Sequence, residues 1–238
     1  MSRTIFSAFA CLLLAGGGLV NADIFTESFE SAPGTTYTLS AEFDDGFFDY
    51  FGRYMVPDNM NGARDDFQLG WDGNFGIHGQ DHDGDNGNSA TQSIMINGID
   101  ISGEPQLALT VALGALNSEP AFNNYEAADG DGIRIFASID SGAFDLIGEF
   151  APNATGEGDL YRDTGGNGIG NGARLTTELQ DFSFLIAGTG STLDIRIDLT
   201  STGGFEPLAV DNVRIVPEPT SSLLLAAVGI GGLLRRRK

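Results

Sequence analysis

Apolar residues in this chain recur at every second position, and no stretch between Asp23 and Val216 keeps the 3.6-residue spacing of an amphipathic helix. In residues 107–113, four large apolar side chains alternate with alanine and threonine. In residues 193–199, leucine and isoleucine alternate with aspartate and arginine. This period predicts two strands, each buried on one face.

Six further segments have the composition of strands and are separated by glycine-rich turns: residues 24–29, 93–96, 133–139, 144–150, 182–186 and 210–216. Asp140-Ser141-Gly142, between two of them, is typical of a hairpin turn. We therefore expect an all-β fold in residues 23–216, an antiparallel β-sandwich of jelly-roll type. A glycine-rich β-solenoid is the structural alternative, but the chain has no repeat of fixed period.

The N-terminus has the features of an export signal. Residues 1–22 contain one charge, Arg3, followed by an apolar run that ends in Val20-Asn21-Ala22, small residues suited to a leader peptidase. We expect a signal helix that signal peptidase removes. The residues before Cys11 fit a lipidation site poorly, so lipid attachment is not expected.

The C-terminus combines three elements in order. Pro217-Glu218-Pro219 comes first, then a stretch rich in Leu, Ala and Gly, then Arg235-Arg236-Arg237-Lys238. About 14 uncharged residues reach roughly 21 Å as a helix, which is short of the roughly 30 Å hydrocarbon core of a bilayer. We expect the apolar stretch of the 217–238 tail, Leu223 to Leu234, to form a sorting helix that inserts only transiently, with the arginines that follow it on the cytoplasmic side.

These three elements resemble the PEP-CTERM sorting signal of exported bacterial proteins. The resemblance covers about the last 23 residues. It implies that an exosortase, a membrane-embedded transpeptidase-like enzyme, processes the chain near Pro217-Glu218-Pro219 and delivers it to the envelope, surface or extracellular matrix. An ordinary tail anchor is the alternative.

The region between the two termini is strongly acidic. Five of the 12 basic residues lie in the terminal segments, so seven arginines face 32 acidic residues and the net charge is −25. This charge repels phosphate backbones and argues against a nucleic-acid partner. The only cysteine, Cys11, lies in the signal segment, which excludes disulfides and zinc–cysteine sites from the mature chain.

Aromatic residues and aspartates are interleaved between Phe43 and Trp71. Rings stack on the apolar faces of sugars while carboxylates accept from their hydroxyl groups, so Tyr50, Tyr54 and Trp71 are candidate residues for binding a polysaccharide. The same aromatic residues could instead be core side chains, because aromatic residues in strands mostly pack.

One acidic loop has the spacing of a calcium site. Asp81, Asp83 and Asp85 alternate in a glycine-rich segment, so three carboxylates could face one hard cation. The loop is not an EF-hand, because Asn86 and Gln92 stand where that motif needs Gly and Glu. A solvated acidic turn is the alternative. Asp129-Gly130-Asp131-Gly132 could form a second cluster, although such pairs are first of all turn formers.

The two ends of the expected sandwich supply further ligands. Glu27 and Glu30 belong to the first strand and Asp211 to the last, and these strands commonly lie close together in a jelly roll. The three carboxylates could therefore converge on a structural Ca²⁺.

Short glycine- and aspartate-rich segments give the body a resemblance to the jelly-roll accessory domains of secreted bacterial proteins. They are Asp44-Asp45-Gly46, Asp49-Tyr50-Phe51, the loop at Asp81, and residues 98–103, 186–190 and 209–212. The resemblance implies an accessory module and no reaction.

No catalytic signature is present. His78 and His82 are the only histidines; both stand in glycine-rich surroundings, where we expect exposed loops, and neither accompanies a Ser or Cys nucleophile motif. We expect a non-catalytic, calcium-stabilised protein of the cell surface or matrix. A carbohydrate-binding module that attaches to polysaccharide is the alternative, ahead of a glycoside hydrolase, which would need two facing carboxylates.

Overall fold

The computed structural model describes residues 22–45, 49–56, 69–84, 87–116, 125–153 and 156–218. The predicted signal helix and sorting helix lie outside these residues. So do Asp85 of the predicted calcium loop and Pro219, Arg235, Arg236 and Arg237 of the predicted sorting signal. Within the described ranges, no helix has the length and apolar character needed to cross a membrane.

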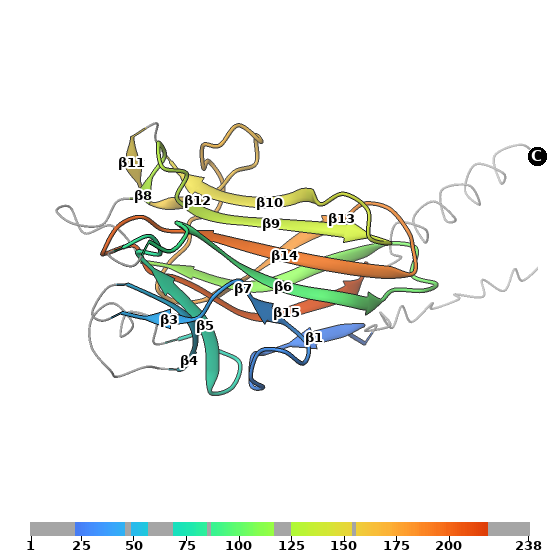
Figure 1. Ribbon diagram of the computed structural model, residues 1–238. Helices are drawn as coiled ribbons and strands as arrows, with labels where there is room; N and C mark the ends of the chain where they lie inside the picture. Colours follow the sequence, from blue (N-terminus) through green and yellow to red (C-terminus); the bar gives the residue numbers. More distant parts are fainter. Residues whose placement is uncertain are drawn as a thin grey trace, which may run out of the picture. The chain divides into compact units, whose positions relative to one another are not determined.

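One sheet has seven strands in the order β13-β7-β15-β5-β4-β3, with β1 pairing with β15 (Figure 1). All of its pairings are antiparallel. Its strands are β1 (Phe25–Glu27), β3 (Phe43–Asp44), β4 (Tyr50–Met55), β5 (Phe75–Gln80), β7 (Leu107–Ala115), β13 (Gln180–Ile186) and β15 (Leu208–Pro217).

The second sheet has six strands in the order β12-β10-β9-β14-β6-β2, again antiparallel. They are β2 (Thr38–Leu39), β6 (Thr91–Asp100), β9 (Gly132–Ile139), β10 (Asp145–Pro152), β12 (Leu160–Arg162) and β14 (Thr192–Thr200). A separate short pair joins β8 (Tyr125–Glu126) to β11 (Glu157–Gly158). Two antiparallel sheets with one core confirm the predicted all-β sandwich.

The core follows from the alternation in the sequence. In β14, Leu193, Ile195 and Ile197 are fully buried while the charged residues between them are half-buried. Strand β7 differs from the prediction, because it is buried on both faces. On its second face, Ala112 packs with Leu179, Ala209 and Trp71. The small alanine side chains let the segments that carry Leu179 and Trp71 pack closely against the sheet.

The hairpin expected at Asp140-Ser141-Gly142 joins β9 to β10. Asp140 and Ser141 have φ values of 51° and 58°, and the Gly142 amide donates to the Ile139 carbonyl at 3.0 Å. Positive φ at both central residues suits the right-handed twist of the strands. The Asp140 carboxylate also accepts the amides of Ser191 and Thr192, which lowers its pKa.

Both ends of the described body lie at the same end of the sandwich. The Ile24 amide donates to the Ile215 carbonyl at 2.8 Å, and β15 ends two residues later. The β6–β7 and β13–β14 connections lie at this end too (Figure 1). β5, β7 and β14 end at the opposite end of the sandwich.

Candidate functional site

Three carboxylates converge at the end of the sandwich opposite to the two chain ends. Glu126 lies in β8, Asp131 immediately precedes β9, and Glu206 lies between β14 and β15. One oxygen from each lies within 4.8 Å of the others. Asp131 and Glu206 are 1% and 2% exposed, and Glu126 is half-buried. We call Glu126, Asp131 and Glu206 the acidic triad.

Backbone amides and a threonine hold the acidic triad in place. Asp131 accepts the Glu126 amide at 2.7 Å and the Thr202 hydroxyl at 3.2 Å. Glu206 accepts the Gly203 amide at 3.0 Å and the Thr202 amide at 3.3 Å. The loop between β14 and β15 therefore positions two of the three carboxylates.

Burial changes the protonation of Asp131 and Glu206. It raises the pKa of Asp131 to about 7, and hydrogen bonding to the Glu126 side chain adds to the rise. Burial, Glu126 and the charge of Asp131 raise the pKa of Glu206 to about 10. No arginine of the described part of the chain forms an ion pair with the three groups. The neighbouring carboxyl groups must therefore hold protons or a cation at neutral pH.

The donor atoms of the acidic triad suit a hard cation. All three are carboxylate oxygens, which Ca²⁺ and Mg²⁺ prefer, whereas the triad contains no nitrogen or sulfur ligand of the kind that zinc favours. Oxygens on opposite sides of a Ca²⁺ ion, each at about 2.4 Å, are about 4.8 Å apart. The Glu126 Oε2 atom is buried, and no donor among the described residues reaches it. The acidic triad could thus hold a metal ion.

The predicted calcium loop is described only in part. Asp81 has a φ of 46° and its amide donates to the Ser201 hydroxyl at 2.9 Å, so the loop packs beside the β14–β15 connection. Asp83 is exposed. Among the described residues, Asp81 and Asp83 do not gather with a third ligand. Because Asp85 lies outside them, a calcium ion in this loop stays a prediction.

The first and last strands, β1 and β15, are neighbours as predicted. The placement of Glu30 in the first strand is wrong, because β1 ends at Glu27, but Glu30 and Asp211 still contact the same turn. Glu30 accepts the amides of Asn74 and Phe75, at 2.6 and 2.9 Å, and these bonds help to lower its pKa. Asp211 accepts the Asp72 amide at 2.6 Å. Both carboxylates therefore hold the 72–75 turn that leads into β5.

Asp211 is fully buried at a bulge in β15, between the stretches that pair with β5 and with β1. Burial raises its pKa to about 7, and the charges of Asp72 and Glu30 contribute to the rise. Glu27 is buried as well, and it accepts from the Phe29 amide and the Thr36 hydroxyl. Calcium at these three residues stays a prediction.

The three candidate sugar-binding rings have different exposures. Tyr50 is fully buried, whereas Tyr54 and Trp71 are half-buried. Trp71 stacks on His78 with ring centroids 4.7 Å apart and planes 8° from parallel, and Tyr54 meets the same His78 edge-on at 6.2 Å. The structure thus gathers Tyr54 and Trp71 around one buried imidazole.

An open depression of about 340 Å³ lies beside Tyr54. It combines aromatic, acidic and basic side chains: Glu42, Phe43, Asp44, Phe51, Arg53 and Tyr54, together with Gly52. The Tyr54 hydroxyl donates to the Phe43 carbonyl at 3.1 Å, which fixes the ring at the rim. Such a mixture can contact both the apolar face and the hydroxyl groups of a sugar.

The expectation of exposed histidines is wrong, because His78 and His82 are both fully buried. The glycines on either side of His78 predicted a loop, but His78 lies in strand β5. His82 contacts the ring of Phe51 edge-on, and its Nδ1 is 3.0 Å from the Ala90 carbonyl oxygen. Burial lowers the pKa of His82 to about 4, although backbone contacts with Ala90 and Leu199 act in the opposite direction.

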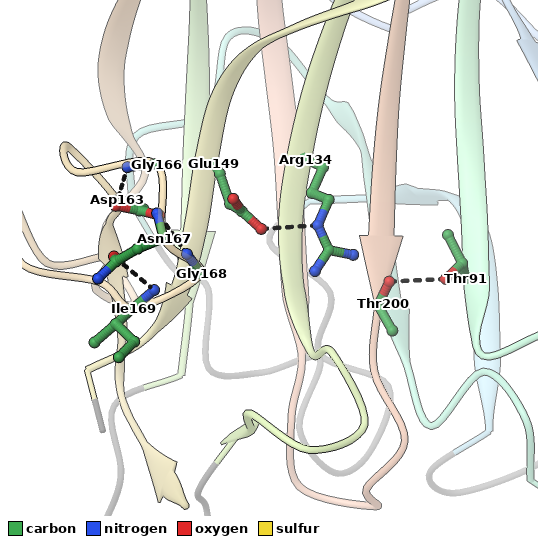
Figure 2. A network of polar contacts seen from close by, with 9 residues as sticks. All are labelled: Thr91, Arg134, Glu149, Asp163, Gly166, Asn167, Gly168, Ile169 and Thr200. Carbon is green, nitrogen blue, oxygen red and sulfur yellow. Dashed lines mark hydrogen bonds and ion pairs between the residues drawn. The ribbon is translucent and has the colours of Figure 1, made fainter. Parts of the chain in front are cut away.

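A glycine-rich loop after β12 is organised by Asp163, as Figure 2 shows. Its Oδ1 accepts the amides of Gly165 and Gly166, and its Oδ2 accepts those of Asn167 and Gly168, at 2.7 to 2.8 Å. Burial acts to raise its pKa, but these four bonds together lower it. Because backbone amides occupy both oxygens, this carboxylate orders its loop.

Sequence reasoning found only one member of the acidic triad. Asp131 lies in the Asp129-Gly130-Asp131-Gly132 segment considered as a second cluster, whereas Glu126 and Glu206 were missed. Glu126 and Glu206 are 80 positions apart and sit in no acidic run. The sequence offered one signal for this site, which is that Asp131 and Glu206 both come shortly before a predicted strand.

Comparison with known proteins identifies the C-terminus. Residues 216–238 match the family model of the PEP-CTERM protein-sorting motif. The motif implies an exported protein that is sorted to the cell surface and processed by an exosortase. No curated protein matches the sequence.

Several solved β-sandwich structures are similar to the body. The Stig cyclase Fisc from Fischerella sp. TAU is 15% identical, with 78% of this chain and 86% of that chain covered and a TM-score of 0.42. The CBM22-1 xylan-binding domain of Paenibacillus barcinonensis Xyn10C is 8% identical, with 83% and 95% covered and a TM-score of 0.39. The K1 adhesin domain of Lys-gingipain from Porphyromonas gingivalis W83 is 13% identical, with 80% and 96% covered and a TM-score of 0.40. Sequence identities and TM-scores this low support no inference about function.

The buried His82 predicts a loss of stability in mild acid. The pKa of a histidine in the unfolded chain is about 6.5, whereas burial lowers the pKa of His82 in the folded protein to about 4. The unfolded state therefore binds more protons between these values, and stability falls as the pH falls. Relative to His82→Gln, which cannot titrate, the wild type should lose roughly 3 kcal/mol of unfolding free energy between pH 7 and pH 4.

Denaturant titration of both proteins at the two pH values, at fixed ionic strength, measures this difference. Comparison with the variant cancels the contributions of the buried carboxylates, which are common to both proteins. Equal pH dependence in the two proteins would contradict the burial of a neutral His82.

Proposed function

We propose that this chain is an exosortase substrate that displays a non-catalytic β-sandwich of jelly-roll type on the cell surface or in the extracellular matrix. The observation that carries the proposal is the PEP-CTERM motif at residues 216–238, which begins within the last strand of the sandwich. Signal peptidase removes residues 1–22, and the apolar tail inserts transiently before processing. The sorting signal and the displayed domain are thus consecutive parts of one chain.

The first and last strands of the body pair with each other. The Ile24 amide donates to the Ile215 carbonyl, and β1 pairs with β15. Processing of the leader and of the tail therefore leaves the pairing of β1 with β15 intact.

Deleting residues 223–238 tests the sorting proposal. The truncated protein keeps its signal peptide and every described residue, so it should be exported and fold but accumulate in the medium. The full chain should be recovered from the envelope or matrix of a host that has an exosortase. Fractionation and immunoblotting measure the distribution, with the exposed-site variant Asp145→Asn as the matched full-length control. Equal surface retention of the truncated and full-length chains would contradict the proposal.

We further propose that Ca²⁺ stabilises the sandwich at the acidic triad, with the 81–85 loop and Glu27, Glu30 and Asp211 as the other predicted ligand sets. Without a cation, Glu206 holds a proton at neutral pH and Asp131 is partly protonated, and their favourable contribution is lost as the pH rises through their raised pKa values. A divalent cation replaces those protons. Its stabilising effect should therefore be larger at pH 8 than at pH 6.

A calcium titration of thermal unfolding tests the metal proposal. At a Ca²⁺ concentration of about 100 times Kd, the melting temperature should rise by roughly 5 to 10 °C. Glu206→Gln should leave the calcium-free protein as stable as the wild type, because the amide resembles the protonated carboxyl group, but should lose most of the calcium response. Asp145→Asn, an exposed substitution on β10, should keep it. A full response in Glu206→Gln would exclude the acidic triad.

The alternative function is a carbohydrate-binding module, and the depression beside Tyr54 favours it. In affinity electrophoresis against matrix polysaccharide, Tyr54→Ala should lower the affinity about fivefold, since stacking of a sugar on a ring contributes on the order of 1 kcal/mol. Tyr54→Phe keeps the ring and should retain binding. Met55→Ala, at the adjacent exposed position, is the matched control. Equal retardation of Tyr54→Ala and wild type would exclude this site.

A further inference from the structure

The depression beside Tyr54 lies at one edge of the seven-stranded sheet. β3 is the outermost strand there, and it pairs with β4 through two residue pairs, the last of which joins Phe43 to Phe51 (Figure 1). β4 continues past this pair as far as Met55. The lining of the depression comes from residues 42–44 on one side and 51–54 on the other. Two neighbouring antiparallel strands therefore build the whole depression.

The alternation of side chains in β4 divides this lining between the two faces of the sheet. Phe51 and Arg53 point to one face, and Gly52 and Tyr54 point to the other. Phe51 is fully buried in the hydrophobic core, so the face that it shares with Arg53 is the inner one. Tyr54 therefore lies on the outer face of the sheet, and Arg53 does not.

Gly52 brings a carboxylate and an aromatic ring together on this outer face. A Cβ atom at Gly52 would lie 3.7 Å from the Oε1 atom of Glu42 and 3.6 Å from the Cε2 atom of Tyr54. Both groups thus lie over the same glycine. Asp44, two residues after Glu42 on the same strand side, lines the depression as well. The outer face of the depression therefore combines the Tyr54 ring with two carboxylates.

The positive charge of the lining is directed elsewhere. Arg53 is the only basic residue among the described residues that line the depression. Its Nε and Nη2 atoms donate to the carbonyls of Phe29 and Glu30, and its guanidinium carbon lies 3.4 Å from the centre of the Phe75 ring. Glu42 is exposed, and no arginine of the described part of the chain forms an ion pair with it. The depression therefore presents negative charge to a ligand.

From the ring, the carboxylates and the position of Arg53, we propose that the depression binds a sugar that carries a protonated amine, such as a glucosamine unit of a polysaccharide. The apolar face of the sugar contacts the Tyr54 ring, and its ammonium group donates to Glu42. The net charge of −25 attracts such a ligand and repels a uronic acid. The inference rests on the alternative proposed function, because it names the ligand class of the same depression.

Calorimetric titration with three tetrasaccharides tests the ligand class. Tetramers of glucosamine, N-acetylglucosamine and galacturonic acid are compared at pH 6, in physiological salt with EDTA. The glucosamine tetramer should bind about fivefold more tightly than the neutral tetramer, as expected for one exposed ion pair, and the anionic tetramer should not bind. Equal affinity for the first two would overturn the ligand class but keep the carbohydrate-binding function. Binding of none of the three would overturn both.

Two charge variants separate this site from general attraction to an acidic surface. Glu42→Gln keeps the shape of the side chain and should weaken glucosamine tetramer binding about fivefold, while leaving binding of the neutral tetramer unchanged. Asp145→Asn makes the same charge change at an exposed position on β10 of the other sheet and should leave both affinities unchanged. Equal losses in the two variants, with unchanged melting temperatures, would overturn the site.

Spermidine tests whether the sugar ring is needed. It carries protonated amines but has no apolar ring face to place against Tyr54, so it should bind at least fivefold more weakly than the glucosamine tetramer. Spermidine binding as tight as that of the tetramer, and equally sensitive to Glu42→Gln, would show a site for amines in general and would overturn the amino-sugar assignment.

Discussion

Strand β15 is the element on which the remaining structure depends. On one side it pairs with β7 along nearly its whole length; on the other it pairs first with β5 and then with β1. The first and last strands of the body are thereby joined. A bulge between Asp211 and Arg214 separates the two partners on that side and places Asp211 where the 72–75 turn enters β5. The sorting motif therefore begins at the end of a strand that both neighbours hold up to Ile215, and its first two residues still pair with β7.

The concentration of carboxylates at one end of the sandwich adds a second constraint. The body has a net charge of −25, and described carboxylates such as Asp163 and Glu30 are hydrogen-bonded to backbone amides. The acidic triad differs, because Asp131 and Glu206 are buried beside one another with raised pKa values. Burial of like charges is unfavourable unless protons or a cation compensate them. This is why the acidic triad, and not the more conspicuous Asp81 loop, is the strongest metal candidate among the described residues.

The sequence predicted most of the sandwich, because alternation reports directly which face of a strand is buried. The eight predicted strands all coincide with observed ones, and the Asp140 hairpin lies where its turn residues placed it. β5 was missed because its sequence FGIHGQ contains two glycines and a histidine. The burial of β7 on both faces was missed because alanine and threonine fit either a solvated face or a closely packed one.

The candidate site was harder to predict, since it depends on contacts between distant segments. Nothing near Glu126 or Glu206 in the chain indicates that β8 and the β14–β15 connection meet. The Glu30 and Asp211 pairing could be anticipated because it follows from the adjacency of the first and last strands. The sorting motif needed no fold at all, because its order of residues is itself the signal.

The folded sheet extends through Glu218, into the sorting motif itself. Hydrogen–deuterium exchange of the purified protein, followed at single amides, measures this directly. The amide of Glu218 should exchange much more slowly than an unstructured amide and should share the protection of the neighbouring β15 amides. Exchange at Glu218 and Val216 at the rate of an unstructured chain, alongside protected β7 and β14, would contradict it.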